Sequence, residues 1–179
     1  MILPAEDTLA AGAKISAAWA NSDIRDAVNA VLAGWACSVN NSGNISCPTS
    51  GTAQLLTWDS EDYDTDGIHS TVTNTSAFTC QTPGSYLFMY SIAWSGSSTG
   101  TRRIDARLNA GGSFTGGTAL PRLGIQQGVG GNAGAQGLVG FGEVRLSVGQ
   151  TVEFWGTQAS GGALNVLAGS WVTCRLVTS

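Results

Sequence analysis

The chain of 179 residues is poor in charge. Only 11% of its residues are Asp, Glu, Lys or Arg, lysine occurs once, at Lys14, and the formal net charge is −4. A nucleic-acid surface needs clustered cations to neutralise phosphates, so we expect no nucleic-acid partner. No stretch approaches the roughly 20 consecutive apolar residues that cross a bilayer, so we expect no membrane span either.

Residues for catalysis and for metal binding are also scarce. The single histidine, His69, has no histidine partner, and no two of the four cysteines are spaced as Cys-x-x-Cys, which argues against a zinc site. No catalytic residues are predicted, and the protein is not expected to be an enzyme. The N-terminus lacks a basic segment followed by a continuous apolar core, so no secretory signal is predicted and synthesis in a cytoplasm is expected.

The residues that are abundant indicate a globular all-β protein. Twenty-five glycines, together with many serines and threonines, interrupt short apolar runs, while six tryptophans and 42% apolar residues supply a core. The length fits one domain with an appendage, because domains commonly hold about 100–150 residues.

Residues 71–94 carry the most specific pattern in the chain. A strand-like run to Cys80 is followed by Pro83-Gly84, which favours a type II turn, and by a second strand from Ser85. Tyr86, Phe88 and Tyr90 fall on one face of that second strand, and its other face is also largely apolar. A strand that is apolar on both faces is expected at the centre of a sheet.

This segment resembles the globular head of complement subcomponent q, whose jelly roll is shared with tumour necrosis factor. The likeness rests on Phe78-Thr79-Cys80, Pro83-Gly84, Tyr86 and Phe88, and three further pieces agree in order: 58–67, 144–152 and 171–177. It covers residues 54–179. The resemblance implies a ten-stranded jelly-roll β-sandwich that forms a compact homotrimer, is displayed on a stalk or anchor, and binds rather than catalyses.

We accordingly divide the chain into an arm with one short helix (1–35), a polar linker (36–51) and a jelly-roll head (52–179). In the predicted helix, Asn21 or Ser22 is suited to the N-cap position, and Gly34 is suited to end the helix at its C-terminus. A helix this short needs a partner surface, which is either its own sandwich or another protein. The candidate anchor residues are Ile24, Arg25, Val28, Val31 and Leu32.

The same helix resembles N-terminal segments of structural proteins from tailed phages of actinobacteria. Asn21, Asp23, Arg25, Asp26, Val28, Asn29 and Leu32 carry this likeness. It implies a virion protein, and the short anchor favours a trimeric decoration protein bound to the major capsid protein. The alternatives are a tail-associated protein that binds a host surface ligand, or a bacterial surface or spore-coat head. The last of these normally follows collagen-like repeats, which are absent from this sequence.

Two residue groups are candidate sites. Asp62-x-Asp64-x-Asp66-Gly67 copies the opening of an EF-hand loop, although Thr73 stands where the bidentate glutamate is required. Calcium is therefore a candidate ligand beside a plain solvated acidic loop, and no other cofactor is expected. Large aromatics dominate both cores and interfaces, so Tyr86, Tyr90, Phe154 and Trp155 are trimer-interface candidates, with core packing or ligand stacking as alternatives.

The cysteines leave several pairings open. Cys37 and Cys47 flank a short polar interval that a disulfide would close. The family's sandwich implies that the strands holding Cys80 and Cys174 are neighbours, so a contact between these two is also expected. Assembly in a cytoplasm favours four buried free thiols instead.

Overall fold

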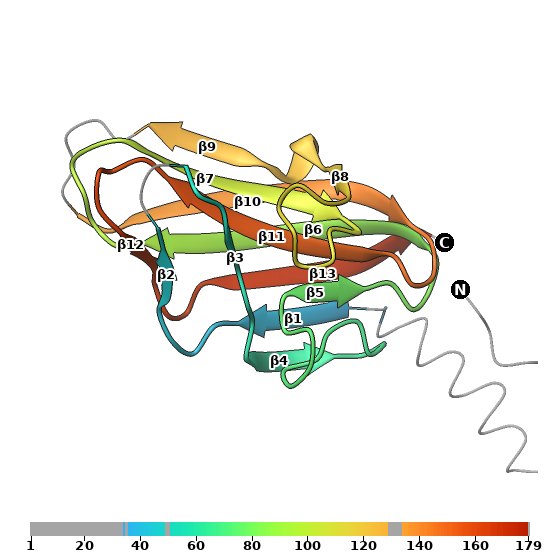
Figure 1. Cartoon of the computed structure of the whole chain (residues 1–179). Helices are drawn as coiled ribbons and strands as arrows, with labels where there is room; N and C mark the ends of the chain where they lie inside the picture. The colour runs from blue at the N-terminus through green and yellow to red at the C-terminus, as the bar shows by residue number, and fades with distance from the viewer. Residues whose placement is uncertain (1–33, 35, 49–50, 129–133, 179) are drawn as a thin grey trace, which may run out of the picture.

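A computed structural model describes residues 34, 36–48, 51–128 and 134–178. These residues form thirteen strands and one 3-10 turn (Figure 1). The strands are β1 Ala36–Asn40, β2 Ile45–Cys47, β3 Gln54–Leu55, β4 Ser60–Asp64, β5 Ala77–Thr79, β6 Gly84–Trp94, β7 Thr101–Leu108, β8 Thr118–Ala119, β9 Ile125–Gly128, β10 Gln136–Leu146, β11 Thr151–Gln158, β12 Leu164–Val166 and β13 Trp171–Thr178, and η2 is Pro121–Leu123.

Strand β6 lies at the centre of the first sheet, as its sequence predicts. It pairs with β10 along its whole length, from Gly84 opposite Leu146 to Trp94 opposite Gln136. On its other side lies β13, followed by β1 and then β4, and the short strands β12 and β2 continue the sheet beyond one end of β6. All of these pairs are antiparallel.

The second sheet is built on β11. Strand β7 pairs along one edge of β11, and the short strands β3 and β5 share the other edge. The far edge of β7 carries β8 and β9. The two sheets stack face to face, as Figure 1 shows, which is the two-layer arrangement of a jelly-roll sandwich. The predicted all-β jelly-roll fold is confirmed.

The core between the sheets is aromatic. Alternate residues of β6, including Tyr86, Phe88 and Tyr90, are buried, as expected for one face of a strand. The ring of Phe154 from β11 lies 5.4 Å from that of Tyr90 and 5.9 Å from that of Phe78. Tilted and edge-to-face contacts at these separations stabilise aromatic cores beyond the area that they bury.

Strand β10 comes unusually close to the turn η2. A Cβ on Gly142 would lie 2.7 Å from the carbonyl oxygen of Arg122, and one on Gly140 would lie 2.3 Å from the hydroxyl of Tyr90. That hydroxyl donates to the carbonyl oxygen of Leu123 at 2.8 Å. The glycines therefore let η2 pack directly beneath β10.

Two local predictions are wrong. Residues 36–47 do not form a linker, because β1 and β2 are strands of the first sheet and bury Cys37, Val39 and Cys47. Gly84 is already the first residue of β6, so Pro83-Gly84 is not the centre of a type II turn. The long glycine-rich stretch 111–137 contains the short strands β8 and β9.

The arm and helix predicted for residues 1–35, with the anchor residues Ile24, Arg25, Val28, Val31 and Leu32, lie almost wholly outside the described residues. Among the residues that are described, no helix has the length and hydropathy needed to span a membrane.

Candidate functional site: the outer face of the first sheet

The first sheet turns one face to the second sheet and the other to solvent, and we call the latter the outer face. Strand register places its side chains in cross-strand rows, because residues directly opposite each other point to the same side. The central rows are Val139–Ser91–Trp171–Asn40, Phe141–Met89–Thr173–Ser38–Tyr63 and Glu143–Leu87–Arg175–Ala36. The face therefore runs from apolar residues on β10 to polar and aromatic residues on β1 and β4.

The β10 end of the outer face is apolar, and we call it the apolar edge. Phe141 is 74% exposed and Val139 is 64% exposed, and Met89 beside them on β6 is also exposed. The only partner strand of β10 among the described strands is β6, so its other edge carries unpaired backbone groups. A long apolar edge strand of this kind is a surface to which another chain can pair or pack.

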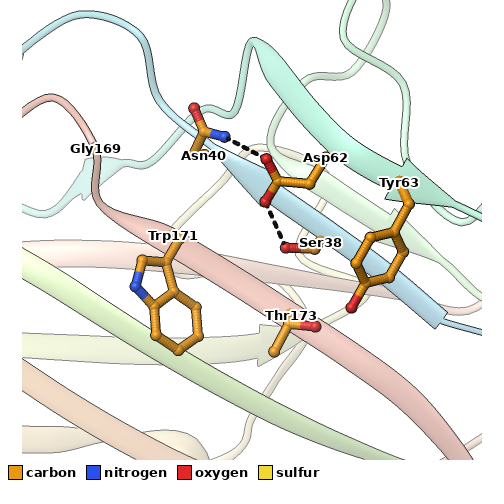
Figure 2. A pocket seen from close by; sticks show the side chains of 7 residues that line it. All are labelled: Ser38, Asn40, Asp62, Tyr63, Gly169, Trp171 and Thr173. Carbon is orange, nitrogen blue, oxygen red and sulfur yellow. Dashed lines mark hydrogen bonds between the residues drawn. The ribbon is translucent and has the colours of Figure 1, made fainter.

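At the opposite end lies an open hollow of about 510 Å³, which we call the Tyr63–Trp171 hollow. Figure 2 shows the indole of Trp171 and the phenol ring of Tyr63 flanking Ser38 and Thr173. Gly169, Asn40 and Asp62 complete its lining. Aromatic rings beside a few fixed polar groups are typical of surfaces that bind another molecule.

The carboxylate of Asp62 is held in place at the rim of this hollow. A bulge in the β1–β4 pairing leaves Asp62 between Tyr63, which faces Ser38, and Glu61, which faces Val39. One carboxylate oxygen accepts a hydrogen bond from the Ser38 hydroxyl at 2.9 Å, and the other faces the Asn40 amide at 3.5 Å, as Figure 2 shows.

A second hollow of about 490 Å³ lies on the other side of Tyr63. Its lining includes the apolar side chains of Leu87 and Met89 and the exposed guanidinium of Arg175. Tyr63 and Thr173 line both hollows, so the two hollows are neighbours on the outer face.

The three aspartates suggested for calcium do not converge. Asp62 bonds to β1, whereas both oxygens of Asp64 accept from backbone amides, of Asp66 at 3.1 Å and of His69 at 2.8 Å. Burial, with a further contribution from the charge of Asp64, raises the pKa of Asp66. Among the described residues, no group of three or more acidic, histidine or cysteine side chains is placed to hold a metal ion.

The four aromatic interface candidates are buried within a single chain. Tyr86, Tyr90, Phe154 and Trp155 are each 4% exposed or less. They have almost no surface left for a neighbouring subunit, so the prediction that they form an interface is wrong and the core alternative holds. Burial also raises the pKa of the Tyr86 and Tyr90 hydroxyls above the usual value.

The four cysteines are buried free thiols. Cys47 lies opposite Leu164 in the β2–β12 pair, so the suggested link from Cys37 to Cys47 is wrong. Cys37 instead lies directly opposite Cys174 in the β1–β13 pair. The Cys80 thiol donates a hydrogen bond to the carbonyl oxygen of Thr82 at 3.2 Å.

No nucleophile and base are brought together around His69. Its two ring nitrogens face a Glu61 carboxylate oxygen at 2.9 Å and the Thr75 carbonyl oxygen at 3.0 Å. The stretch Gly96–Gly100 has the spacing Gly-x-Ser-x-Gly, but it connects β6 of the first sheet to β7 of the second instead of opening a helix as a nucleophile elbow does.

The exposed residues of the outer face were missed from sequence. A signal exists in β13, where Val172 and Cys174 are apolar, so Trp171, Thr173 and Arg175 must point the other way. In β10 the signal is misleading, because Val139 and Phe141 alternate with glycines and therefore suggest the core-facing positions.

No protein-family model and no curated protein matches the sequence. Solved structures do match. The globular domain of zebrafish complement 1qA has a TM-score of 0.56 and 16% identity, over 80% of this chain and 97% of that one. Eiger TNF from S. frugiperda has a TM-score of 0.59 and 15% identity, over 82% of this chain and 94% of that one. Murine APRIL has a TM-score of 0.57 and 10% identity, over 80% of this chain and 98% of that one. At these identities the likeness shows the fold.

Proposed function

We propose that the chain is a non-enzymatic virion structural protein, a homotrimeric jelly-roll head that decorates the capsid of a tailed phage. The observation that best supports a trimer is that exposed apolar side chains are concentrated on the first sheet. Of the eight large hydrophobic residues exposed among the described ones, six lie on the first sheet: Tyr63, Met89, Val139, Phe141, Trp171 and Val177. Exposed apolar side chains concentrated on one sheet typically mark a protein contact.

A closed threefold ring needs two different surfaces on each subunit, because its contacts are head-to-tail. The outer face supplies both of them. The apolar edge projects Phe141 and Val139, and the two hollows beside Tyr63 are concave and lined by aromatic, apolar and polar groups. Glu143 on β10 and Arg175 in the second hollow add opposite charges to the two surfaces.

Attachment to the capsid is proposed for residues 1–33. The support is the apolar stripe of Ile24, Val28, Val31 and Leu32, together with the likeness of this stretch to phage structural proteins. The described residues from Ala36 onward form both sheets and the core. The head is therefore expected to fold without the preceding segment.

The experiment compares three proteins added back to particles that lack the chain: the full chain, the variant Ile24→Asp/Val28→Asp, and a chain that begins at Gly34. Co-sedimentation with the particle measures attachment, sedimentation velocity measures the oligomer, and thermal melting checks the fold. We expect all three to be trimers with equal melting temperatures and only the full chain to bind. Equal binding by the shortened chain would place attachment on the sandwich and refute this assignment.

The Tyr63–Trp171 hollow favours a second candidate, a tail-associated protein that binds a host surface ligand. In that case the hollow stays open in the assembled protein instead of receiving a neighbouring subunit. Adsorption of wild-type and Trp171→Ala particles to host cells separates the two functions. A decoration protein leaves adsorption unchanged, whereas a receptor-binding protein loses it.

A further inference from the structure

Two buried thiols lie face to face across the first sheet. Cys37 of β1 and Cys174 of β13 are direct cross-strand partners, and both side chains are fully buried on the core side. A hydrogen bond with Cys174, followed by burial, raises the pKa of the Cys37 thiol well above its usual value. The two thiols therefore face each other across the β1–β13 pair, within the core.

The register also meets the geometric requirement for a disulfide. Directly opposed residues of an antiparallel pair have Cα atoms about 4.5–5.5 Å apart, and disulfides span Cα separations of about 4.4–6.8 Å. Neither of the other cysteines has a cysteine opposite it, since Cys47 faces Leu164 and Cys80 lies outside the strands. The strand pairing thus brings one cysteine pair into position.

We propose that Cys37 and Cys174 are a latent redox clasp, which a peroxide closes into a disulfide joining β1 to β13. The sulfur of one thiol attacks a peroxide oxygen, the O–O bond breaks, and water leaves behind a sulfenic acid. The second sulfur then attacks the first, the S–O bond breaks, and a second water leaves. Two thiols and one hydrogen peroxide thus give one disulfide and two waters.

At this location the disulfide would strengthen the attachment of β1 to the rest of the head. Strand β1 is where the described head begins, so a pull on the preceding segment would act first on β1. Its neighbours are β13 and the short strand β4, whose middle residues are exposed. Without the disulfide β1 is held by hydrogen bonds and packing, and with it β1 is covalently tied to β13. The chemistry is independent of the function proposed above.

The test uses the full chain treated with hydrogen peroxide at a concentration that oxidises the thiols of the urea-unfolded chain. We expect the native protein to lose two hydrogen atoms and to keep two of its four free thiols. Cys37→Ser and Cys174→Ser should keep all of their remaining thiols, whereas Cys47→Ser and Cys80→Ser should still form the bond. Closing so long a loop should raise the melting temperature by about 10 °C.

Several results would overturn the clasp. A native chain that keeps four thiols under these conditions has no pair ready to react. Loss of the bond in Cys80→Ser would assign the disulfide to Cys80 and Cys174. Oxidation to sulfinic acid without a disulfide, or a bond between two chains, would equally show that the opposed pair does not act as proposed.

Discussion

Replacing Phe141 by serine tests the trimer contact at its most exposed apolar residue. A phenylalanine can bury roughly 200 Å², and this one is 74% exposed, so about 150 Å² is available to a neighbour. At about 25 cal/mol per Å², covering it contributes about 4 kcal/mol at each contact, or about 12 kcal/mol for the three contacts of a trimer. Since about 1.4 kcal/mol is a tenfold change in an equilibrium constant, the loss is ample to dissociate the ring.

The assay is sedimentation velocity across nanomolar to micromolar concentrations, with thermal melting of the same samples. Phe141→Ser should sediment as a folded monomer, because the side chain is exposed in the single chain and contributes little to its core. The matched control is Val72→Ser, since Val72 is 85% exposed but lies in the loop before β5. A Phe141→Ser protein that dissociates at the same concentration as wild type would refute the proposed contact.

Two further substitutions probe the interior by thermal melting. Asp66→Asn should raise the melting temperature at pH 7, because burial raises the pKa of Asp66 and so penalises its charged form in the folded state. The gain in melting temperature should vanish as the pH falls through that pKa, because the carboxyl is then neutral in the folded state. A gain that persists in acid would contradict this account. Tyr90→Phe should cost about 1–3 kcal/mol of stability by leaving the buried Leu123 carbonyl without its donor, whereas an unchanged urea midpoint would show that water replaces the hydroxyl.

The core of the fold could be predicted from sequence because its strongest signals are local. In β6, alternate aromatics over eleven residues mark both the strand and its buried face, and β7 shows the same alternation with Ile104 and Ala106. Patterns of this kind depend on the period of the strand and on no other part of the chain. The central position predicted for β6 was therefore correct, whereas its outer face, with Met89, is exposed instead of covered.

The first strand was missed because its pairing is not local. Residues 36–40 alternate like a strand, but the run is short and polar, and its partners are β4 and the distant β13. The outer face was missed for a different reason. In the middle of β10, the Tyr90 ring fills the space beneath Gly140 and the turn η2 fills that beneath Gly142, so these two inner positions carry no side chain and the large residues Val139 and Phe141 point outward. The alternation of large residues with glycines in β10 therefore predicts that Val139 and Phe141 face the core, whereas they face solvent.

The pairing of β1 with β13 also has a consequence for synthesis. The first described strand cannot take its place between β4 and β13 until the chain beyond Trp171 has left the ribosome. Strand pairing between such distant segments is slow and leaves sheet edges uncovered while the chain grows. The edges of β1 and β6 that face β13 would wait unpaired until β13 is made, so the first sheet closes in one late step.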